Sequence, residues 1–260
     1  MTRFINDVKK YFKYSIVSAK SELKSEVASS YLNWLWWILD PVCFMLIYTF
    51  ISVFVFKATE QYFPVFTFIG LSMWDFFSRM MNNSVKIIKN NKAIVSKVYL
   101  PKYILILVKL WVNGFKMFIS FGIVVLMMIV YQVPITLNIL YFVPIIITLA
   151  IISFGGATFL LHYGVFVQDL SNVVTIILRL LFYITGIFYD VAKRIQAPFG
   201  EILSEANPLA FLLKSMRESI LYGTTPNRKL LLLWMFIGLV ITYLGIRKIY
   251  KNENSYVKVI

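Results

Sequence analysis

Six long apolar runs limit what this chain can fold into more than any other feature of its sequence. Each run is long enough to cross about 30 Å of hydrocarbon as a helix that rises about 1.5 Å per residue. The chain has 260 residues, 60% of them hydrophobic, and a mean hydropathy of +0.76, so no room is left for a separate soluble catalytic domain. The sequence predicts an all-α integral membrane protein with six transmembrane helices, at residues 35–56, 64–83, 103–130, 139–161, 170–188 and 229–249.

The segment before the first run predicts a helix that lies on the membrane rather than across it. Between residues 4 and 23, apolar side chains recur at helical spacing and lysines fall between them. A basic amphipathic helix of this kind lies in the membrane interface. We therefore expect an N-terminal amphipathic interface helix within residues 1–33 and a six-span transmembrane domain over residues 34–260.

The distribution of Lys and Arg predicts the orientation. Six spans place both termini on one side, and the segments on that side (1–33, 84–102, 162–169 and 247–260) carry fifteen Lys and Arg residues, whereas the loops of the other side, which include Lys57, carry six. Because cytoplasmic loops are enriched in these residues, we expect both termini in the cytoplasm. The same rule accounts for the net charge of +14 without nucleic acid as a partner.

Two of the loops have unusual compositions. Residues 84–102 are basic and contain no acid, which predicts a short helix on the cytoplasmic membrane surface. Residues 189–228 have intermediate hydrophobicity and are interrupted by Pro198, Pro208 and Pro226. This second loop is too charged to span twice, so it predicts one or two re-entrant half-helices that dip from the outer face.

Motifs for catalysis and nucleotide binding are missing from the sequence. It contains no P-loop, no H-E-x-x-H and no G-x-S-x-G, so we expect no catalytic residue, no metal site and no cofactor bound by this chain. Cys43 is the only cysteine and His162 the only histidine. The first interpretation of His162 is a satisfied histidine at the membrane interface, with a ligand or proton-relay role as the alternative.

Charges at membrane depth are more informative. Arg179 follows Asp169 by ten residues, which places it about 15 Å into the fifth run. A charge there must face protein or water, so Arg179 either lines a pathway or pairs with Asp75. Asp75 can instead pair with Arg79, four residues along the same helix. In the third run, Lys109 can extend to the interface.

Aromatic residues are frequent in the first, second and fifth runs. Sugar rings have apolar faces that pack well on aromatic rings, so aromatic side chains inside a pore would suit a glycan, although packed or lipid-facing bulk is the simpler reading for any one of them. Glycines in the fourth run, Gly155, Gly156 and Gly164, favour close helix packing. The channel-lining candidates are Trp37, Phe44, Tyr48, Phe77, Tyr183, Phe188 and Tyr189.

These features, with several motifs in a fixed order, resemble the permease subunit of ABC-2-type polysaccharide exporters, the transporters of lipid-linked O antigen, capsule and teichoic acid. The resemblance covers almost the whole chain. The chain has Leu32 and Asn33 where the family commonly has Leu-Gly, and Thr185 and Gly186 where it has Ser-Pro. The motifs that carry the resemblance are SSYLNWLWWILDP at 29–41, KAIVSKVYLPKYIL at 92–105, VQDLSNVV at 167–174 and NPLAFLLKSMRESI at 207–220.

The resemblance implies a homodimer in the cytoplasmic (inner) membrane with a channel between the subunits. Each subunit would dock a separate ATP-binding subunit, two copies in all, which binds ATP and Mg. Region 189–228 would form the outer gate, and Lys20, Lys24 or Arg179 would meet the pyrophosphate of a polyprenyl-linked glycan. The coupling segment would be 84–98, with Lys86, Lys89, Lys92, Val95 and Lys97 as contacts to the ATPase.

Three other functions stay open. An ABC-2 exporter of small lipophilic compounds would not need a continuous aromatic track. A membrane enzyme that acts on polyprenyl-linked sugars would need carboxylate or histidine clusters, which the sequence lacks. A basic membrane anchor for acidic partners would leave the six spans without a role.

Overall fold

The computed structural model of this chain describes residues 2–28, 31–55 and 60–259, and over these residues it contains helices and no β-strand. Lys57, from the charge count, and Ser29 and Ser30, from the first family motif, lie outside the described residues.

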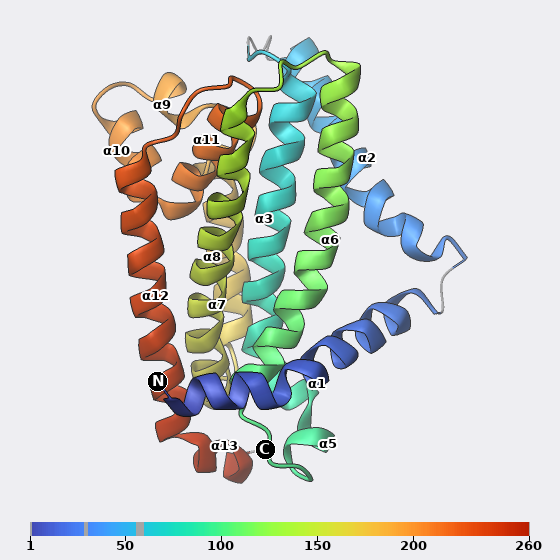
Figure 1. Ribbon diagram of the computed structural model, residues 1–260, viewed down its shortest axis with the longest axis vertical. Coiled ribbons are helices and arrows are strands. Elements are labelled where there is room, and N and C mark those ends of the chain that lie inside the picture. Colours follow the sequence, from blue (N-terminus) through green and yellow to red (C-terminus); the bar gives the residue numbers. More distant parts are fainter. Residues whose placement is uncertain (1, 29–30, 56–59, 260) are drawn as a thin grey trace.

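A helix forms at each of the six predicted runs, and most of these helices run side by side along the long axis of the molecule (Figure 1). The last helical turns of α2 continue as a π-helix at Ile51–Val55. The six helices are α2 (Trp36–Phe50), α3 (Phe63–Val85), α6 (Tyr103–Val130), α7 (Phe142–Phe166), α8 (Leu170–Ile184) and α12 (Arg228–Lys251).

Four of these helical segments are long and apolar enough to cross a membrane: Trp36–Phe54, Tyr103–Val130, Leu137–Phe166 and Arg228–Lys251. Helix α8 is apolar but has only 15 residues, about 22 Å of helix. Helix α3 has 23 residues, but Asp75, Arg79 and a polar last turn lower its hydropathy. The structure therefore supports a multi-pass membrane protein, and the count of six spans stays a prediction.

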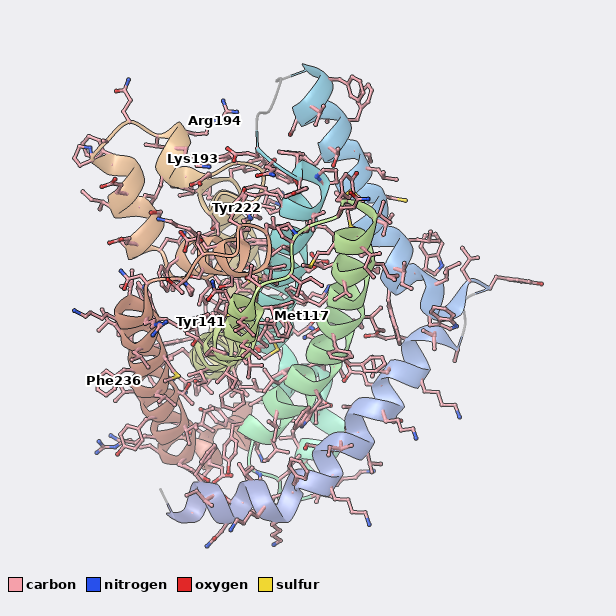
Figure 2. All side chains as sticks on the ribbon, turned by 45° about the horizontal axis from the view of Figure 1, so that its top comes forward. Met117, Tyr141, Lys193, Arg194, Tyr222 and Phe236 are labelled. Atoms are coloured by element: carbon pink, nitrogen blue, oxygen red, sulfur yellow. The ribbon has the colours of Figure 1, made fainter. Side chains whose placement is uncertain are left out.

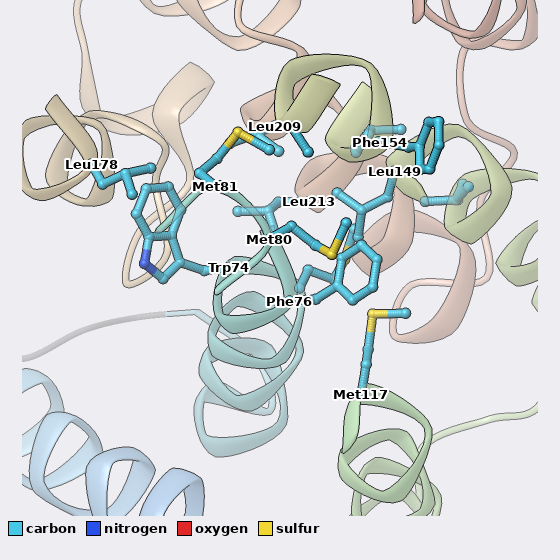
Figure 3. Close-up of a cluster of buried hydrophobic side chains, with 14 of the residues drawn as sticks. Trp74, Phe76, Met80, Met81, Met117, Leu149, Phe154, Leu178, Leu209 and Leu213 are labelled. Carbon is cyan, nitrogen blue, oxygen red and sulfur yellow. The ribbon is translucent and has the colours of Figure 1, made fainter. Parts of the chain in front are cut away.

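Helix α3 lies at the centre of the fold. It packs against α2, α6, α7, α8 and α11 (Pro208–Ile220), and side chains such as Phe68 and Met80 are fully buried. Figure 3 shows side chains of α3, among them Phe76 and Met80, together with Met117 of α6 and Leu149 of α7. In a membrane such a core is held mainly by van der Waals contact, because lipid is as apolar as the core itself.

Helices α7 and α12 approach each other closely through glycines. A Cβ atom on Gly155 would lie 2.9 Å from the Thr242 hydroxyl oxygen, and one on Gly238 would lie 3.0 Å from Ile151. A Cβ atom on Gly164 would likewise clash with the backbone of Val85, at the end of α3. The predicted close packing of the fourth run is confirmed, since larger side chains would force these helices apart.

The remaining helices gather at the two ends of the bundle (Figure 1). The first half of α1 (Thr2–Val27), α4 (Ile87–Asn90), α5 (Lys92–Val95) and α13 (Glu253–Val259) lie at the end that carries both chain ends, which we call the terminal end. At the opposite end, the distal end, lie α9 (Val191–Arg194), α10 (Phe199–Ala206) and α11. The predicted loop at 189–228 thus forms three helices, whose depth in a membrane stays a prediction.

Helix α1 is amphipathic, as expected, but it also packs against a membrane helix. Its first half crosses the terminal end of the bundle and its second half slopes outward (Figure 1). Helix α1 contacts α6, and Ala19 packs with Val108 and Val112 of α6. Lys109 of α6 forms an ion pair with Glu22 of α1. Lys109 thus has a partner in the predicted interface helix, and its depth in a membrane stays a prediction.

Candidate functional site

Aromatic side chains from α2, α3, α8 and the turn after α8 gather in one place. The ring of Tyr48 stacks on that of Phe188, with 3.8 Å between their centroids. The Phe182 centroid lies 6.5 Å from that of Tyr48 and 5.6 Å from that of Trp74, in favourable edge-to-face arrangements. We call this group the aromatic cluster, and it contains Phe44, Tyr48, Trp74, Phe77, Phe182, Tyr183 and Phe188.

Most of the predicted channel-lining residues fall in this cluster. The hydroxyl of Tyr189 also donates a hydrogen bond to the Tyr183 carbonyl at 2.7 Å, so Tyr189 lies beside it. Trp74 is a member that the sequence prediction missed, because the pattern of α3 does not tell which of its aromatic rings meets α8. The predicted members are Phe44, Tyr48, Phe77, Tyr183 and Phe188.

The cluster lies on a face that a single chain leaves uncovered. Phe44 is 50% exposed and Tyr183 is 64% exposed, although both lie in apolar helices. Among the described residues of α2, only Pro41 and Met45 are buried. This face of α2 and α8 is therefore accessible to a channel, to lipid or to another protein chain.

Trp37 is the one predicted candidate that lies apart from the aromatic cluster. Its ring contacts Phe115 of α6 with 6.0 Å between centroids, and the Lys116 ammonium lies 5.6 Å from the Trp37 ring. Trp37 therefore belongs to a second site, on the α6 side of α2.

Arg179 is exposed on α8, one turn before Tyr183. Asp75 does not pair with it, because the Asp75 carboxylate lies 3.4 Å from the Arg79 guanidinium. The alternative of an Arg179–Asp75 pair is thus wrong, and the predicted Asp75–Arg79 pair is confirmed.

A polar cavity of about 400 Å³ lies between the end of α1 and helices α2, α3 and α6. The Arg79 guanidinium lies 3.9 Å from the Asp40 carboxylate, and the Lys116 ammonium lies 2.5 Å from the Glu26 carboxylate. We call it the charged cavity. Sequence reasoning missed the charged cavity because its charges come from four helices. Only Asp75 and Arg79, four residues apart in α3, lie on the same helix.

Arg217 of α11 is a second charge that the sequence did not single out. It is 4% exposed, and its guanidinium donates to the carbonyls of Phe66 (3.2 Å), Gly186 (2.9 Å) and Ile187 (2.7 Å). Burial lowers the pKa of Arg217 to about 9, so it is still charged at neutral pH. The side chain therefore fastens α11 to α3 and to the turn after α8. The sequence could have indicated this role, because Arg217 lies with Met216 and Ile220 on the apolar face of an amphipathic stretch.

Charged side chains also connect the short helices of the distal end. The Lys193 ammonium lies 3.5 Å from the Glu60 carboxylate and 5.8 Å from the Tyr222 ring. Figure 2 shows Lys193 and Arg194 near Tyr222 at this end. The Asp190 side chain caps α9 through the backbone N–H of Ala192 at 3.0 Å. These contacts hold α9 over the end of the bundle.

The predicted coupling segment forms two short helices, α4 and α5, at the terminal end. Ile87, Ile88 and Val95 are buried, so the segment is anchored by its apolar side chains. Val95 was expected to contact the ATPase, and its burial gives it an anchoring position instead. The four predicted lysines are exposed at the surface: Lys86, Lys89, Lys92 and Lys97.

A hydrogen-bonded network ties α1 to Tyr99, which directly follows the coupling segment, to the end of α12 and to the start of α13. Arg3 donates to the Tyr99 hydroxyl at 2.7 Å and to Glu253 at 3.3 Å. The Tyr250 hydroxyl donates to Asp7 at 2.7 Å and lies 2.8 Å from the Tyr103 hydroxyl. A displacement of the coupling segment would therefore move Tyr99 and, through its hydrogen bond with Arg3, also move α1.

His162 is buried, and its Nδ1 lies 2.7 Å from the Tyr256 hydroxyl. The interpretation of a satisfied histidine is confirmed.

Lys20 and Lys24 line the rim of a large apolar groove. The groove has a volume of about 980 Å³ and lies between α1, α2, α6 and α7, with Trp111, Phe118 and Phe121 among its lining residues. Both lysines are exposed. The two basic candidates at α1 thus lie next to apolar surface, while Arg179 lies on α8.

Together these observations define a helical, multi-pass membrane protein with aromatic side chains on an uncovered face and exposed lysines at the terminal end. No family model matches the chain.

The chain is similar over almost its whole length to permeases of O-antigen export. It is 27% identical, over 96% of its length, to the O-antigen export system permease protein RfbA of Klebsiella pneumoniae, of which 95% is covered. It is 22% identical, over 94% of both chains, to a protein of the same name from Myxococcus xanthus. These relatives support the resemblance to ABC-2-type polysaccharide export permeases and fit a transport subunit.

Proposed function

We propose that this chain is the transmembrane subunit of an ATP-driven ABC transporter that exports a lipid-linked polysaccharide, with O antigen the favoured cargo, across the cytoplasmic membrane. The observation that carries the proposal is the aromatic cluster on the uncovered face of α2 and α8. Aromatic faces attract the apolar faces of sugar rings without holding any one sugar tightly. A long glycan could therefore slide past them.

A second copy of the chain would cover this face and enclose the channel. Arg179 supports this arrangement, because an arginine that faces lipid at the centre of a membrane costs about 3 kcal/mol or more. A water-filled channel at a homodimer interface removes that cost. The same face would bring the two aromatic clusters to opposite walls of one passage.

The energy would come from a separate ATP-binding subunit, two copies per transporter, that binds ATP and Mg. The exposed lysines of the coupling segment give it a basic surface to dock on, and the network from Arg3 to Tyr99 offers a route by which its motion reaches α1. This assignment makes the terminal end cytoplasmic, as the Lys and Arg distribution predicts.

The lipid carrier would approach at α1. Lys20 and Lys24 can meet a pyrophosphate, while the apolar groove beside them fits part of a polyprenyl chain. At the distal end, α9, α10 and α11 would form the outer gate, which Arg217 fastens to the bundle.

Deletion and complementation in the source cell test the proposal. We expect deletion to remove the long-chain surface polysaccharide from gels and to leave lipid-linked glycan inside the cell, and the wild-type chain to reverse both effects. Unchanged surface polysaccharide after deletion would contradict the proposal. Accumulation of a small lipophilic compound instead would favour the exporter of small molecules, for which the large apolar groove is the supporting feature.

A further inference from the structure

The charged cavity lies beside the aromatic cluster. Asp40, Phe44 and Tyr48 follow one another at intervals of four residues in α2, so they share one face of that helix. In α3, Asp75 directly follows Trp74 of the aromatic cluster. The cavity also borders the end of α1, through Glu26. It is therefore placed where a chain that passes from α1 toward the aromatic cluster would first meet polar side chains.

The charges of the cavity are already paired with one another. Arg79 lies between Asp40 and Asp75, at 3.9 Å and 3.4 Å, and Lys116 pairs with Glu26 at 2.5 Å. Three carboxylates face two cations, so the cavity has no excess of positive charge to attract a pyrophosphate. Within the described part of the chain, no three Asp, Glu, His or Cys side chains are grouped to hold a metal ion. A neutral polar ligand suits these electrostatics best.

The paired side chains keep capacity for further hydrogen bonds. The Asp40 side chain is 55% exposed, and those of Asp75 and Arg79 are each 43% exposed. Carboxylates accept hydrogen bonds and the guanidinium donates them, while Asn113 and Ser120 add an amide and a hydroxyl to the lining. Donors and acceptors side by side are what a ligand rich in hydroxyl groups needs, since each hydroxyl both donates and accepts.

Indole rings complete the lining. Trp36 and Trp37 border the cavity, and the apolar face of a sugar ring packs well on an indole. The volume of about 400 Å³ lies within the range of about 300–1,000 Å³ that is usual for small-molecule sites.

We propose that the charged cavity is a subsite that binds one uncharged pyranose unit of the glycan before it reaches the aromatic cluster. This inference rests on the proposed function and adds a defined sugar contact to it. Asp40 and Asp75 accept hydrogen bonds from the sugar hydroxyls, Arg79 donates to them, and Trp37 packs on the ring face.

Saturation-transfer NMR on the full-length protein in nanodiscs tests the subsite. The probes are glucose, galactose, mannose, rhamnose, N-acetylglucosamine, and the polysaccharide released by mild acid from the surface of the source cell. We expect at least one of them to show transfer to its ring protons. We expect the signal to fall at least fivefold in Asp40→Ala and in Trp37→Ala, and inorganic pyrophosphate not to compete.

Asp169→Ala is the matched control, because Asp169 is an exposed aspartate at the start of α8 outside the cavity. Asp40→Ala should fold, since Arg79 keeps Asp75 as a partner; equal gel-filtration profiles check this. If Asp40→Ala fails to fold, Trp37→Ala decides the test.

The subsite is overturned if no probe binds the wild-type protein, if both variants bind as well as the wild type, or if pyrophosphate displaces the sugar. Failure of the subsite is distinct from failure of the proposed function. A wild-type chain that restores polysaccharide export but binds none of the probes would refute the subsite alone. A chain that restores no export in its deletion strain would refute the function itself.

Discussion

At the scale of single residues, the two most informative arginines differ in burial and in hydrogen bonding. Arg217 is buried and donates three hydrogen bonds to backbone carbonyls, whereas Arg179 is exposed on an apolar helix. The sequence predicts the depth of Arg179, because depth follows from counting residues along a helix. It does not predict the role of Arg217, because Phe66 and Gly186 are far from it in the sequence.

We expect Arg217→Met to destabilise the protein. The change leaves three buried carbonyls without their donor, at about 1 kcal/mol or more each, so the free energy of unfolding should fall by about 3 kcal/mol. A loss of this size lowers Tm by about 6–12 °C in a chain of this length. Thermal unfolding in detergent measures it, with Arg194→Met, at an exposed position, as the control. Equal Tm values for both variants would contradict the role of Arg217 as a fastening.

We expect Arg179→Leu to leave stability intact and to lower export. Removing a charge at membrane depth costs no internal pair in the described structure, so Tm should stay the same or rise. Export should fall, because the channel loses a polar group. Measurement of Tm together with surface polysaccharide checks both. A drop in Tm of several degrees would mean that Arg179 is paired internally after all.

At the scale of elements, the helices follow from the apolar pattern but their mutual placement does not. All six predicted runs are helical, yet α8 ends at Ile184, because Gly186 has a φ of +76° and turns the chain toward Phe188. That turn creates the stack of Phe188 on Tyr48. The pairing of Glu26 with Lys116 likewise depends on how α1 contacts α6, which the amphipathic pattern of α1 does not specify.

The aromatic cluster should matter for export through its rings. We expect the combined change of Tyr48, Tyr183 and the adjacent Tyr189 to Leu to lower export at least about tenfold. Lost aromatic contacts are worth about 0.5–1.5 kcal/mol each, and about 1.4 kcal/mol corresponds to tenfold. Pulse labelling of surface polysaccharide measures the rate. The control is the same change at three exposed tyrosines elsewhere, Tyr31, Tyr131 and Tyr243. Unchanged export in the first variant would refute the aromatic track.

The coupling segment should bind the ATPase through charge. Reversal of Lys86, Lys89 and Lys97 to Glu should lower the amount of co-purified ATPase at least about tenfold, because rim charges govern association and unlike charges become alike. The matched control reverses three exposed basic residues of the distal end, Arg194, Arg228 and Lys229. Equal losses in both variants would mean that net charge, not the coupling segment, holds the ATPase.

At the scale of the whole molecule, the structure is one of the two transmembrane subunits of the proposed homodimeric transporter. Its core is closed around α3, while the face of α2 and α8 is open and the terminal end carries exposed lysines. The sequence alone predicts a membrane protein with a basic side. It cannot predict that Phe188 stacks on Tyr48 or that Arg79 meets Asp40, because these contacts join helices that are distant in the chain.

The most direct test of this account is affinity purification of the solubilised protein from its native membrane, with the co-purifying chains identified and ATP hydrolysis measured. We predict a P-loop ATPase in equal amount, with two copies of each chain per particle and measurable hydrolysis of ATP. A pure preparation without an ATPase would contradict the account and would favour an enzyme that acts on lipid-linked sugars.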